Sequence, residues 1–416
     1  MTRPFSDAAQ IQSLLDVEAA LAGAAARPAD FDMAALGRGA EAAGNLVIPL
    51  VRRLTELVAA KHPESAGDVH RGATSQDILD TALVLQLRTA AAIVHETLSR
   101  GVDGAARLAR EHATTPMPGR TWLQQSSPVT LGLKAAGWLD MIGRCRERLG
   151  RAADSAMVVQ LGGASGTLAA LGEAGPRVAE AFARRLSLSV PEMPWHAARD
   201  RLAEVACAMG VTCGALGKIG RDLTLLAQTE VGEVIETPSA DRGGSSSMPH
   251  KQNPVRAVRA IAAATRAPGL VATLLAAMPQ EHERGAGGWQ AEWDTWPPLV
   301  ETTIDAADAI ADALQNVTVD VARMRANLDR DGGVAMAEAL STALLNRVGR
   351  VEAMALVTRV SSVSRRERRA LAEVAADDPE ITRHLTREEI THALAPEHFL
   401  GAAPLLTERV LRRWSV

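Results

Sequence analysis

Long proline-free intervals constrain this chain more than any other feature of its sequence. Residues 64–115, 195–237 and 299–378 contain no proline, so each interval has room for helices far longer than the average of about 11 residues. In the first interval, apolar side chains return at spacings of three and four, which predicts a helix with a broad buried stripe. The stripe comprises Ile78, Leu79, Ala82, Leu83, Leu85, Leu87, Ala90, Ile93 and Val94. Ser75 is placed to cap this helix, with Asp77 in its first turn.

Three further stretches have the same helical character: 197–236, 299–314 and 335–360. Alanine, the strongest helix former, makes up 78 of the 416 residues. No alternating run and no short hairpin signal stands out. The sequence therefore predicts an all-α fold, with a long central helical bundle flanked by two smaller helical domains. Small residues in the first stretch recur at steps of three and four and permit another helix to approach closely; they are Ala206, Gly210, Gly214, Gly217 and Gly220.

Glycine-containing segments interrupt the helical pattern at Arg71/Gly72 and at Leu328–Gly333. We therefore expect an N-terminal helical domain over residues 1–71, the central bundle over 72–328 and a C-terminal helical domain over 329–416. Long apolar helices in a chain of this size often complete their core by association with further copies.

Charge and cysteine content narrow the class of protein. A formal net charge of −4 argues against a nucleic-acid binder. Three scattered cysteines provide neither a disulfide framework nor a paired metal motif, and they indicate a reducing compartment. The first residues lack an apolar signal core, and the longest uncharged stretch, 155–172, is too polar for a membrane span. We expect a cytoplasmic protein with no metal and no other cofactor.

The strongest chemical signal lies in residues 243–254, which read GGSSSMPHKQNP. Glycine, serine and proline indicate a loop whose backbone a ligand is able to approach closely. Lys251 supplies positive charge and Asn253 supplies hydrogen bonds, which suits a small anionic substrate. On composition alone, an ordinary surface linker is an equal alternative. The chain has 41 arginines and only four lysines, however, so a lysine in this loop departs from the general bias.

This segment matches the signature G-S-S-x-M-P-x-K-x-N-P and so resembles the fumarase/aspartase superfamily, which includes fumarase, aspartase, argininosuccinate lyase and adenylosuccinate lyase. Every fixed position is filled, Met248 among them. The resemblance implies that Ser245 takes or gives the proton next to a substrate carboxylate, which Lys251 and Asn253 hold. A serine alkoxide needs stabilisation, and backbone N–H groups together with Lys251 would supply it in a water-poor loop.

Residues 70–77, HRGATSQD, resemble the first conserved region of this superfamily, where a Thr-Ser pair binds substrate carboxylate at the start of a long helix. The resemblance assigns Thr74 and Ser75 to substrate binding, and the free N–H groups of a helix start are a natural anion site. His70 matches a histidine of several members and joins the candidate binding residues. For Ser75, a purely structural role as helix cap is the alternative.

Residues 119–134 resemble the second conserved region, which supplies Arg120, Thr121 and Gln125 as candidate binding residues. Fumarase and adenylosuccinate lyase have a histidine of their acid–base machinery where this chain has Trp122. An indole does not transfer protons near neutral pH, so hydration and amine elimination are less expected. The chain also has no tyrosine, which leaves Ser245 at the centre of the expected mechanism.

Within the superfamily, the chain most resembles the 3-carboxy-cis,cis-muconate cycloisomerases, whose second region reads G-R-T-W-L-Q as it does here. The resemblance implies a cofactor-free homotetramer, with sites shared between subunits, that acts on a small polycarboxylate in protocatechuate degradation. In lactone formation the substrate's own carboxylate is the nucleophile, so one acid/base suffices. Arg284, in a segment that is also similar, is a further candidate contact for the tri-anionic substrate.

Two positions depart from those cycloisomerases, because Arg71 and Gln125 replace a tryptophan and a histidine. The alternative function is therefore a lyase that eliminates an amine- or nitrite-type leaving group from a substituted succinate to give fumarate. A non-catalytic structural relative, like the crystallins recruited from this superfamily, is a third hypothesis, and the complete loop argues against it.

Overall fold

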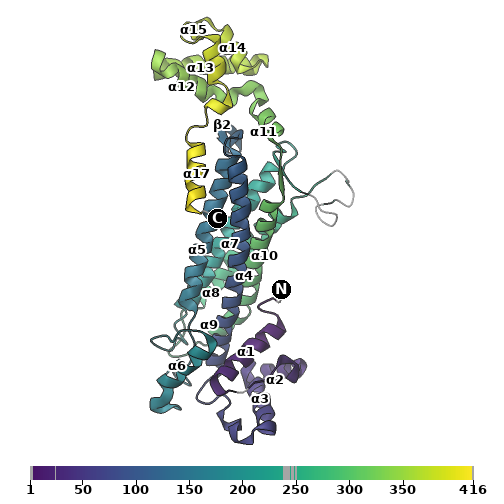
Figure 1. Cartoon of the computed structure of the whole chain (residues 1–416), viewed down its shortest axis with the longest axis vertical. Coiled ribbons are helices and arrows are strands. Elements are labelled where there is room, and N and C mark those ends of the chain that lie inside the picture. Colours follow the sequence, from purple (N-terminus) through teal and green to yellow (C-terminus); the bar gives the residue numbers. More distant parts are fainter. Residues whose placement is uncertain (1–2, 24, 238–243, 245–247, 249–250, 415–416) are drawn as a thin grey trace. The chain divides into compact units, whose positions relative to one another are not determined.

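The structure, a computed structural model, describes residues 3–414 except 24, 238–243, 245–247 and 249–250. It is mostly helical, so the predicted all-α class is confirmed (Figure 1). The longer helices are α1 (Asp7–Ala22), α2 (Met33–Ala43), α3 (Val47–Lys61), α4 (Ser75–Glu111), α5 (Leu131–Ala156), α6 (Gly175–Leu186), α7 (Asp200–Leu226), α8 (Val255–Ala276), α10 (Trp296–Gln315), α12 (Ala337–Val348), α13 (Arg350–Glu367) and α17 (Ala403–Arg413). The shorter ones are α9 (Gly288–Trp293), α11 (Val321–Leu328), α14 (Leu371–Asp377), α15 (Pro379–Thr382) and α16 (Arg387–Ala393). The strands are β1 (Pro116–Thr121), β2 (Gln124–Thr130), β3 (Val234–Glu236) and β4 (Val317–Val319).

The chain divides into two compact units. Unit 1 comprises residues 1–97, 145–215 and 262–307, and unit 2 comprises residues 98–144, 216–261 and 308–416. The five longest helices, α4, α5, α7, α8 and α10, contribute residues to both units. The three domains expected from the sequence, with boundaries at 71/72 and 328/329, stay a prediction.

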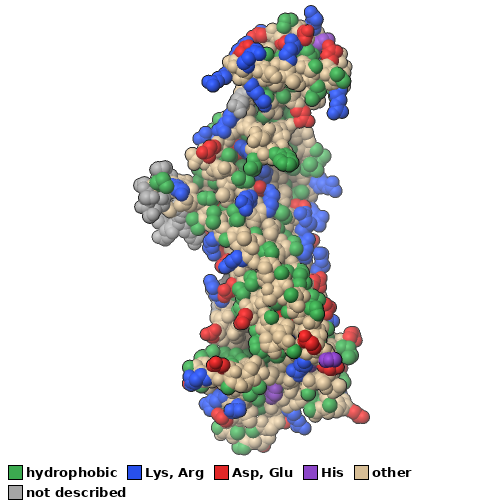
Figure 2. Space-filling model, turned by 180° about the vertical axis from the view of Figure 1, so that it is seen from behind, with side chains coloured by type: hydrophobic (Ala, Val, Ile, Leu, Met, Phe, Trp, Pro, Cys, Tyr) green, Lys and Arg blue, Asp and Glu red, His purple; other side chains and the backbone are tan. Residues whose placement is uncertain are grey.

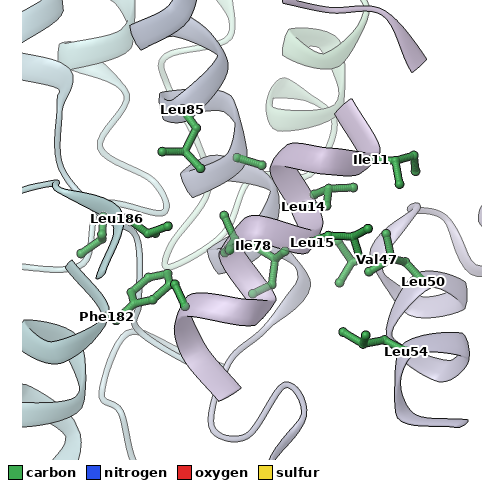
Figure 3. Packing of buried hydrophobic residues seen from close by; sticks show 14 of the residues in the cluster. Ile11, Leu14, Leu15, Val47, Leu50, Leu54, Ile78, Leu85, Phe182 and Leu186 are labelled. Atoms are coloured by element: carbon green, nitrogen blue, oxygen red, sulfur yellow. The ribbon is translucent and has the colours of Figure 1, made fainter. Parts of the chain in front are cut away.

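The core of unit 1 gathers apolar side chains from α1, α3, α4 and α6 (Figure 3). Leu15, Leu50, Ile78 and Phe182 belong to this cluster, and each is at most 2% exposed. Burial of one such side chain stabilises the fold by about 1.5–3 kcal/mol. The apolar stripe predicted along α4 therefore serves as the wall against which the N-terminal helices pack.

A buried ion-pair network fixes the polar side of α4 in unit 1. Arg199 donates to both oxygens of Asp80, at 2.7 and 3.0 Å, and to both oxygens of Glu292, at 2.9 and 2.5 Å. Burial disfavours the charged guanidinium, but Asp80 and Glu292 outweigh it and raise the pKa of Arg199. Charge pairing thus holds together α4, the segment before α7, and α9.

The predicted close approach of a helix to small residues is confirmed at two positions of α7. A Cβ on Gly210 would lie 2.8 Å from Val271 of α8 in unit 1, and a Cβ on Gly220 would lie 2.6 Å from the carbonyl oxygen of Ala257 in unit 2. Gly214 has nothing within 4 Å, so it serves no such contact in the described part of the chain.

One long helix expected over residues 335–360 is wrong, because two helices occupy this stretch. α12 ends at Val348 and α13 begins at Arg350, and Gly349 between them has φ +78°. Glycine enters this left-handed region at no steric cost, so the chain is able to turn there. Leu340 of α12 and Val360 of α13 then meet in a second apolar cluster, which lies in unit 2.

Two small antiparallel sheets contradict the expectation that the chain lacks hairpins. β1 pairs with β2 across the loop Trp122-Leu123, and β3 pairs with β4. The two loop residues have φ of +52° and +62°, a conformation that hairpins normally assign to Asn or Gly. Because Trp-Leu is no turn signal, the sequence does not indicate this hairpin. The helix expected over 197–236 also ends early, at Leu226, and β3 follows it.

The surface carries mixed charge and some uncovered apolar area. On the face shown in Figure 2, basic and acidic side chains are interspersed over the described residues rather than gathered in a band of one sign. By length and composition, α4, α7 and α8 would each be able to cross a membrane. Of their most apolar windows, 56%, 61% and 22% are buried within the chain, so α8 has the most apolar surface left for another contact.

The substitution Leu50→Ala tests the core of unit 1. Leu50 is completely buried, so truncation removes apolar contacts and leaves a cavity, and we expect the free energy of unfolding to fall by about 2–5 kcal/mol. Ile48→Ala is the matched control on the same helix, because Ile48 is 42% exposed and its truncation should cost about 1 kcal/mol or less. Urea unfolding followed by circular dichroism measures both. Equal losses would contradict this account of the core.

Candidate active site

The first predicted binding region lies in unit 1, where α4 begins. The helix starts at Ser75, so Thr74 precedes the first helical residue. The Thr74 N–H donates to Asp77 Oδ2 at 2.9 Å. Asp77 is completely buried and lies in the first turn, where the helix dipole favours negative charge. The expectation that Ser75 caps α4 is therefore corrected, since Thr74 and Asp77 close the first turn.

Arg284 reaches the same helix start. Its Nη2 donates to Thr74 Oγ1 at 2.8 Å and to the carbonyl oxygens of Gly163 and Ala164 at 3.2 and 3.1 Å. Its Nε is buried and has no hydrogen-bond partner among the described residues. Thr74 and Arg284 were predicted from segments 210 positions apart, and the fold brings them together. A guanidinium donor left open beside a helix N-terminus suits a carboxylate ligand.

His70 is held by a buried carboxylate that the sequence did not reveal. Its Nδ1 lies 2.7 Å from Oε1 of Glu18 on α1, and Glu18 is completely buried. A carboxylate accepts, so we assign the hydrogen to Nδ1, which leaves Nε2 for another partner. The only local sign was a glutamate within the apolar stripe of α1. Arg71, in contrast, forms an exposed ion pair with Asp68 at 3.2 Å.

The second region lies in unit 2, on the β1–β2 hairpin. Arg120 makes a two-pronged contact with Glu233, with N–O distances of 2.9 and 2.6 Å, and Glu233 is completely buried. Asn327 donates to Glu233 at 2.8 Å, and its backbone oxygen accepts from Gln125 Nε2 at 2.9 Å. The charge of Arg120 is thus paired within the chain. Glu233 and Asn327 come from distant segments and had no local signal.

The tip of this hairpin carries large apolar side chains on the surface. Trp122 is 97% exposed and Leu123 is 77% exposed, and Thr121 beside them is exposed as well. Water contact on this scale is unfavourable for an indole, and exposed apolar clusters mark interaction sites. The tip is therefore a candidate contact surface.

The signature loop is described only in part. Ser245, the predicted acid/base, lies outside the described residues. Met248 and Lys251 are exposed, and Asn253 Nδ2 donates to the carbonyl oxygen of Gly244 at 3.4 Å. These three candidates, like Arg120, Thr121 and Gln125, belong to unit 2, whereas His70, Thr74, Ser75 and Arg284 belong to unit 1.

One carboxylate ties together the elements on either side of the loop. Glu236, at the end of β3, accepts from the N–H groups of Arg256 and Ala257 at 3.1 and 2.8 Å. These N–H groups of the first turn of α8 have no partner within the helix, and the Glu236 carboxylate satisfies them. Its negative charge also interacts favourably with the positive end of the helix dipole. The strand before the loop and the helix after it are fixed to each other.

Lys134, near the start of α5, adds a second cation to the region around Arg120. Burial lowers its pKa, and Lys218 and Arg120 act in the same direction, whereas Asp222 opposes them.

Within the described ranges, no group of three His, Cys, Asp or Glu side chains is arranged to hold a metal ion. Cys145 and Cys213 are buried, Cys207 is partly buried, and none of the three forms a disulfide in the described chain. The absence of a cofactor stays a prediction.

Comparisons with known proteins cover nearly the whole chain. Residues 18–269 match the family model described as lyase, and residues 333–410 match the adenylosuccinate lyase C-terminus. A 3-carboxy-cis,cis-muconate cycloisomerase of Pseudomonas aeruginosa is 48% identical, over 99% of this chain and 93% of the relative. A nitrosuccinate lyase of Streptomyces davaonensis is 41% identical, over 98% and 91%. The crystal structure of 3-carboxy-cis,cis-muconate lactonizing enzyme from Pseudomonas putida is similar with a TM-score of 0.93 and 44% identity, over 99% and 96% of the two chains.

The substitution Glu233→Gln tests the pairing of Arg120. Loss of one partner of a fully buried ion pair costs about 3–5 kcal/mol, and we expect about 2–3 kcal/mol here because the Arg120 side chain keeps 24% exposure. Glu230→Gln, at an exposed position nearby in the sequence, is the control and should change the free energy of unfolding by about 0.5 kcal/mol or less. Denaturant unfolding measures the free energy of unfolding of both variants. A decrease for Glu233→Gln no larger than that of the control would show that the hairpin does not depend on Glu233.

Proposed function

The chain belongs to the fumarase/aspartase family of lyases and is an enzyme, and we propose that it interconverts 3-carboxy-cis,cis-muconate and its carboxymuconolactone. The observation that carries this proposal is Trp122, which stands where the superfamily's hydrating and amine-eliminating members have a proton-transferring histidine. Cycloisomerisation needs no proton at the leaving group, because that group is the substrate's own carboxylate. The full-length similarity to cycloisomerases supports the same reaction.

The proposed reaction balances with one acid/base group. In lactone formation, an oxygen of one substrate carboxylate forms a C–O bond to an alkene carbon, and the neighbouring carbon takes a proton from Ser245. In the reverse direction, the Ser245 alkoxide removes that proton and the C–O bond breaks. Lys251 and Asn253 would hold the carboxylate next to the proton, and their resemblance to the family signature supports this role.

A second substrate carboxylate would bind at the start of α4. The Thr74 hydroxyl is fixed by Arg284, and the buried Nε of Arg284 is a donor without a partner in the described chain. Ser75 lies in the first turn beside them. Charge-assisted hydrogen bonds of this kind are about twice as strong as neutral ones, so they would orient the polyanion before chemistry.

We further propose a cytoplasmic homotetramer that acts in protocatechuate degradation, with residues from different subunits in each site. The exposed tip at Trp122 supports this assembly, as does α8, of whose most apolar window only 22% is buried within one chain. A second copy would cover both surfaces.

The alternative is a lyase that expels nitrite or an amine from a substituted succinate and releases fumarate. The 41% identity to a nitrosuccinate lyase favours it, as do Arg71 and Gln125, which depart from the cycloisomerase pattern. Nitrite is a good leaving group, so this reaction also dispenses with a histidine at position 122.

The substrate test follows the loss of diene absorbance when enzyme is added to 3-carboxy-cis,cis-muconate. We expect rapid loss with the native enzyme and a decrease in kcat of about 10²–10⁴-fold for Ser245→Ala, since a positioned acid/base contributes that much. Ser362→Ala, on the exposed side of α13, should keep full activity. No turnover of carboxymuconate, together with fumarate formed from nitrosuccinate, would establish the alternative.

Sedimentation equilibrium tests the assembly. At micromolar concentration we expect a mass of four chains of 43.9 kDa each. An active monomer would contradict the shared sites.

A further inference from the structure

Asp77 is a completely buried carboxylate held by four donors. It accepts from the N–H groups of Thr74, Gly162 and Gly163 at 2.9, 2.9 and 3.0 Å, and from His196 Nε2 at 2.7 Å. A buried carboxylate requires such compensation, because loss of its hydration is costly. His196 supplies the only side-chain donor of the four, and it makes the shortest contact.

His196 itself has little freedom. It is 3% exposed, and its carbonyl oxygen accepts from Gln76 Nε2 at 2.9 Å, so α4 holds its backbone as well as its ring. Gly162 packs directly on the imidazole, since a Cβ at that glycine would lie 2.7 Å from Cε1 of His196. A carboxylate accepts, so Nε2 carries the hydrogen in this contact.

Asp77 links His196 to the residues that face a ligand. The N–H of Gly163 binds Asp77, and the carbonyl oxygen of the same residue accepts from Arg284. Likewise, the N–H of Thr74 binds Asp77 while its hydroxyl accepts from Arg284. The position of one carboxylate therefore sets two of the three acceptors that orient the Arg284 guanidinium.

We propose that His196 is a positioning residue for carboxylate recognition: through Asp77 it holds Thr74 and Gly163 at the spacing that aims Arg284 at a substrate carboxylate. This role rests on the proposed function for the identity of the substrate. His196 has no part in proton transfer to the substrate and acts on binding.

Two polar substitutions distinguish the effect of the hydrogen bond donated to Asp77 from the effect of the volume of the imidazole ring. In His196→Gln, the amide nitrogen is as many bonds from Cβ as Nε2 is, so it is able to donate to Asp77. In His196→Asn, the amide nitrogen corresponds to Nδ1 and falls short of Asp77. We expect KM to rise by about tenfold or more for His196→Asn with kcat changed less than threefold, and to stay within about threefold of the native value for His196→Gln.

A structural control comes from the same helix. Thr81 of α4 exchanges two hydrogen bonds with the backbone of Gln160, at 3.1 and 2.9 Å, in the same neighbouring segment that contains Gly162. Thr81→Val removes both without touching Asp77, so we expect a loss of stability without a change in KM. A KM shift equal to that of His196→Asn would overturn the proposal, as would a native KM for His196→Asn or failure of His196→Gln to restore it.

Binding of propane-1,2,3-tricarboxylate, measured by calorimetry on the intact enzyme, keeps the test independent of turnover. We expect this probe to bind His196→Asn about tenfold more weakly than His196→Gln. Equal affinity for the two variants would overturn the positioning role. Inactivity of the native enzyme toward carboxymuconate, with the affinity difference intact, would overturn only the proposed function.

Discussion

The start of α4 buries polar groups whose partners come mostly from other segments of the chain. Gln76, Asp77, Asp80 and Thr81 are each at most 1% exposed, which is rare for such side chains in a helical core. Arg199 forms an ion pair with Asp80 and a second ion pair with Glu292 of α9. Removal of any one partner would leave a buried charge or donor unpaired, which costs more than a lost apolar contact. Hydrogen bonds and ion pairs to these buried groups, rather than apolar packing, therefore set the positions of the segments beside the start of α4.

The arginines of the two candidate regions, Arg120 and Arg284, differ in whether a carboxylate pairs their charge. Glu233 takes both terminal nitrogens of Arg120, so this arginine anchors the hairpin. Within the described part of the chain, one terminal nitrogen of Arg284 donates to three neutral oxygens, and these do not cancel its charge. A guanidinium bound by carbonyl and hydroxyl oxygens keeps most of its attraction for an anion. Of the two, Arg284 is the better suited to a carboxylate.

Much of the fold followed from the sequence because its determinants are local. The proline-free intervals and the apolar spacing of residues 78–94 predicted α4, and the small residues of α7 predicted the contacts at Gly210 and Gly220. The sequence does not predict the β1–β2 hairpin, because Trp122 and Leu123 adopt a backbone conformation that their residue types disfavour. Binding candidates such as Thr74 and Arg284 came from motifs, but Glu18, Glu233 and His196 act through partners dozens of residues away. No local pattern encodes such pairs, since only the folded chain brings them into contact.

The exposed indole at the hairpin tip has a spectroscopic consequence. The chain contains seven tryptophans and no tyrosine, so its ultraviolet emission comes almost entirely from indole. Trp138, Trp195, Trp289, Trp296 and Trp414 are at most 7% exposed, whereas Trp122 is 97% exposed. Trp293 is partly buried. In a single chain, a soluble collisional quencher would therefore act chiefly on Trp122, and the red edge of the emission band would report the surroundings of this indole. Any molecule that covers the tip, whether a small anion or another copy, would shift the Trp122 emission to shorter wavelength. This shift would be measurable without an added label.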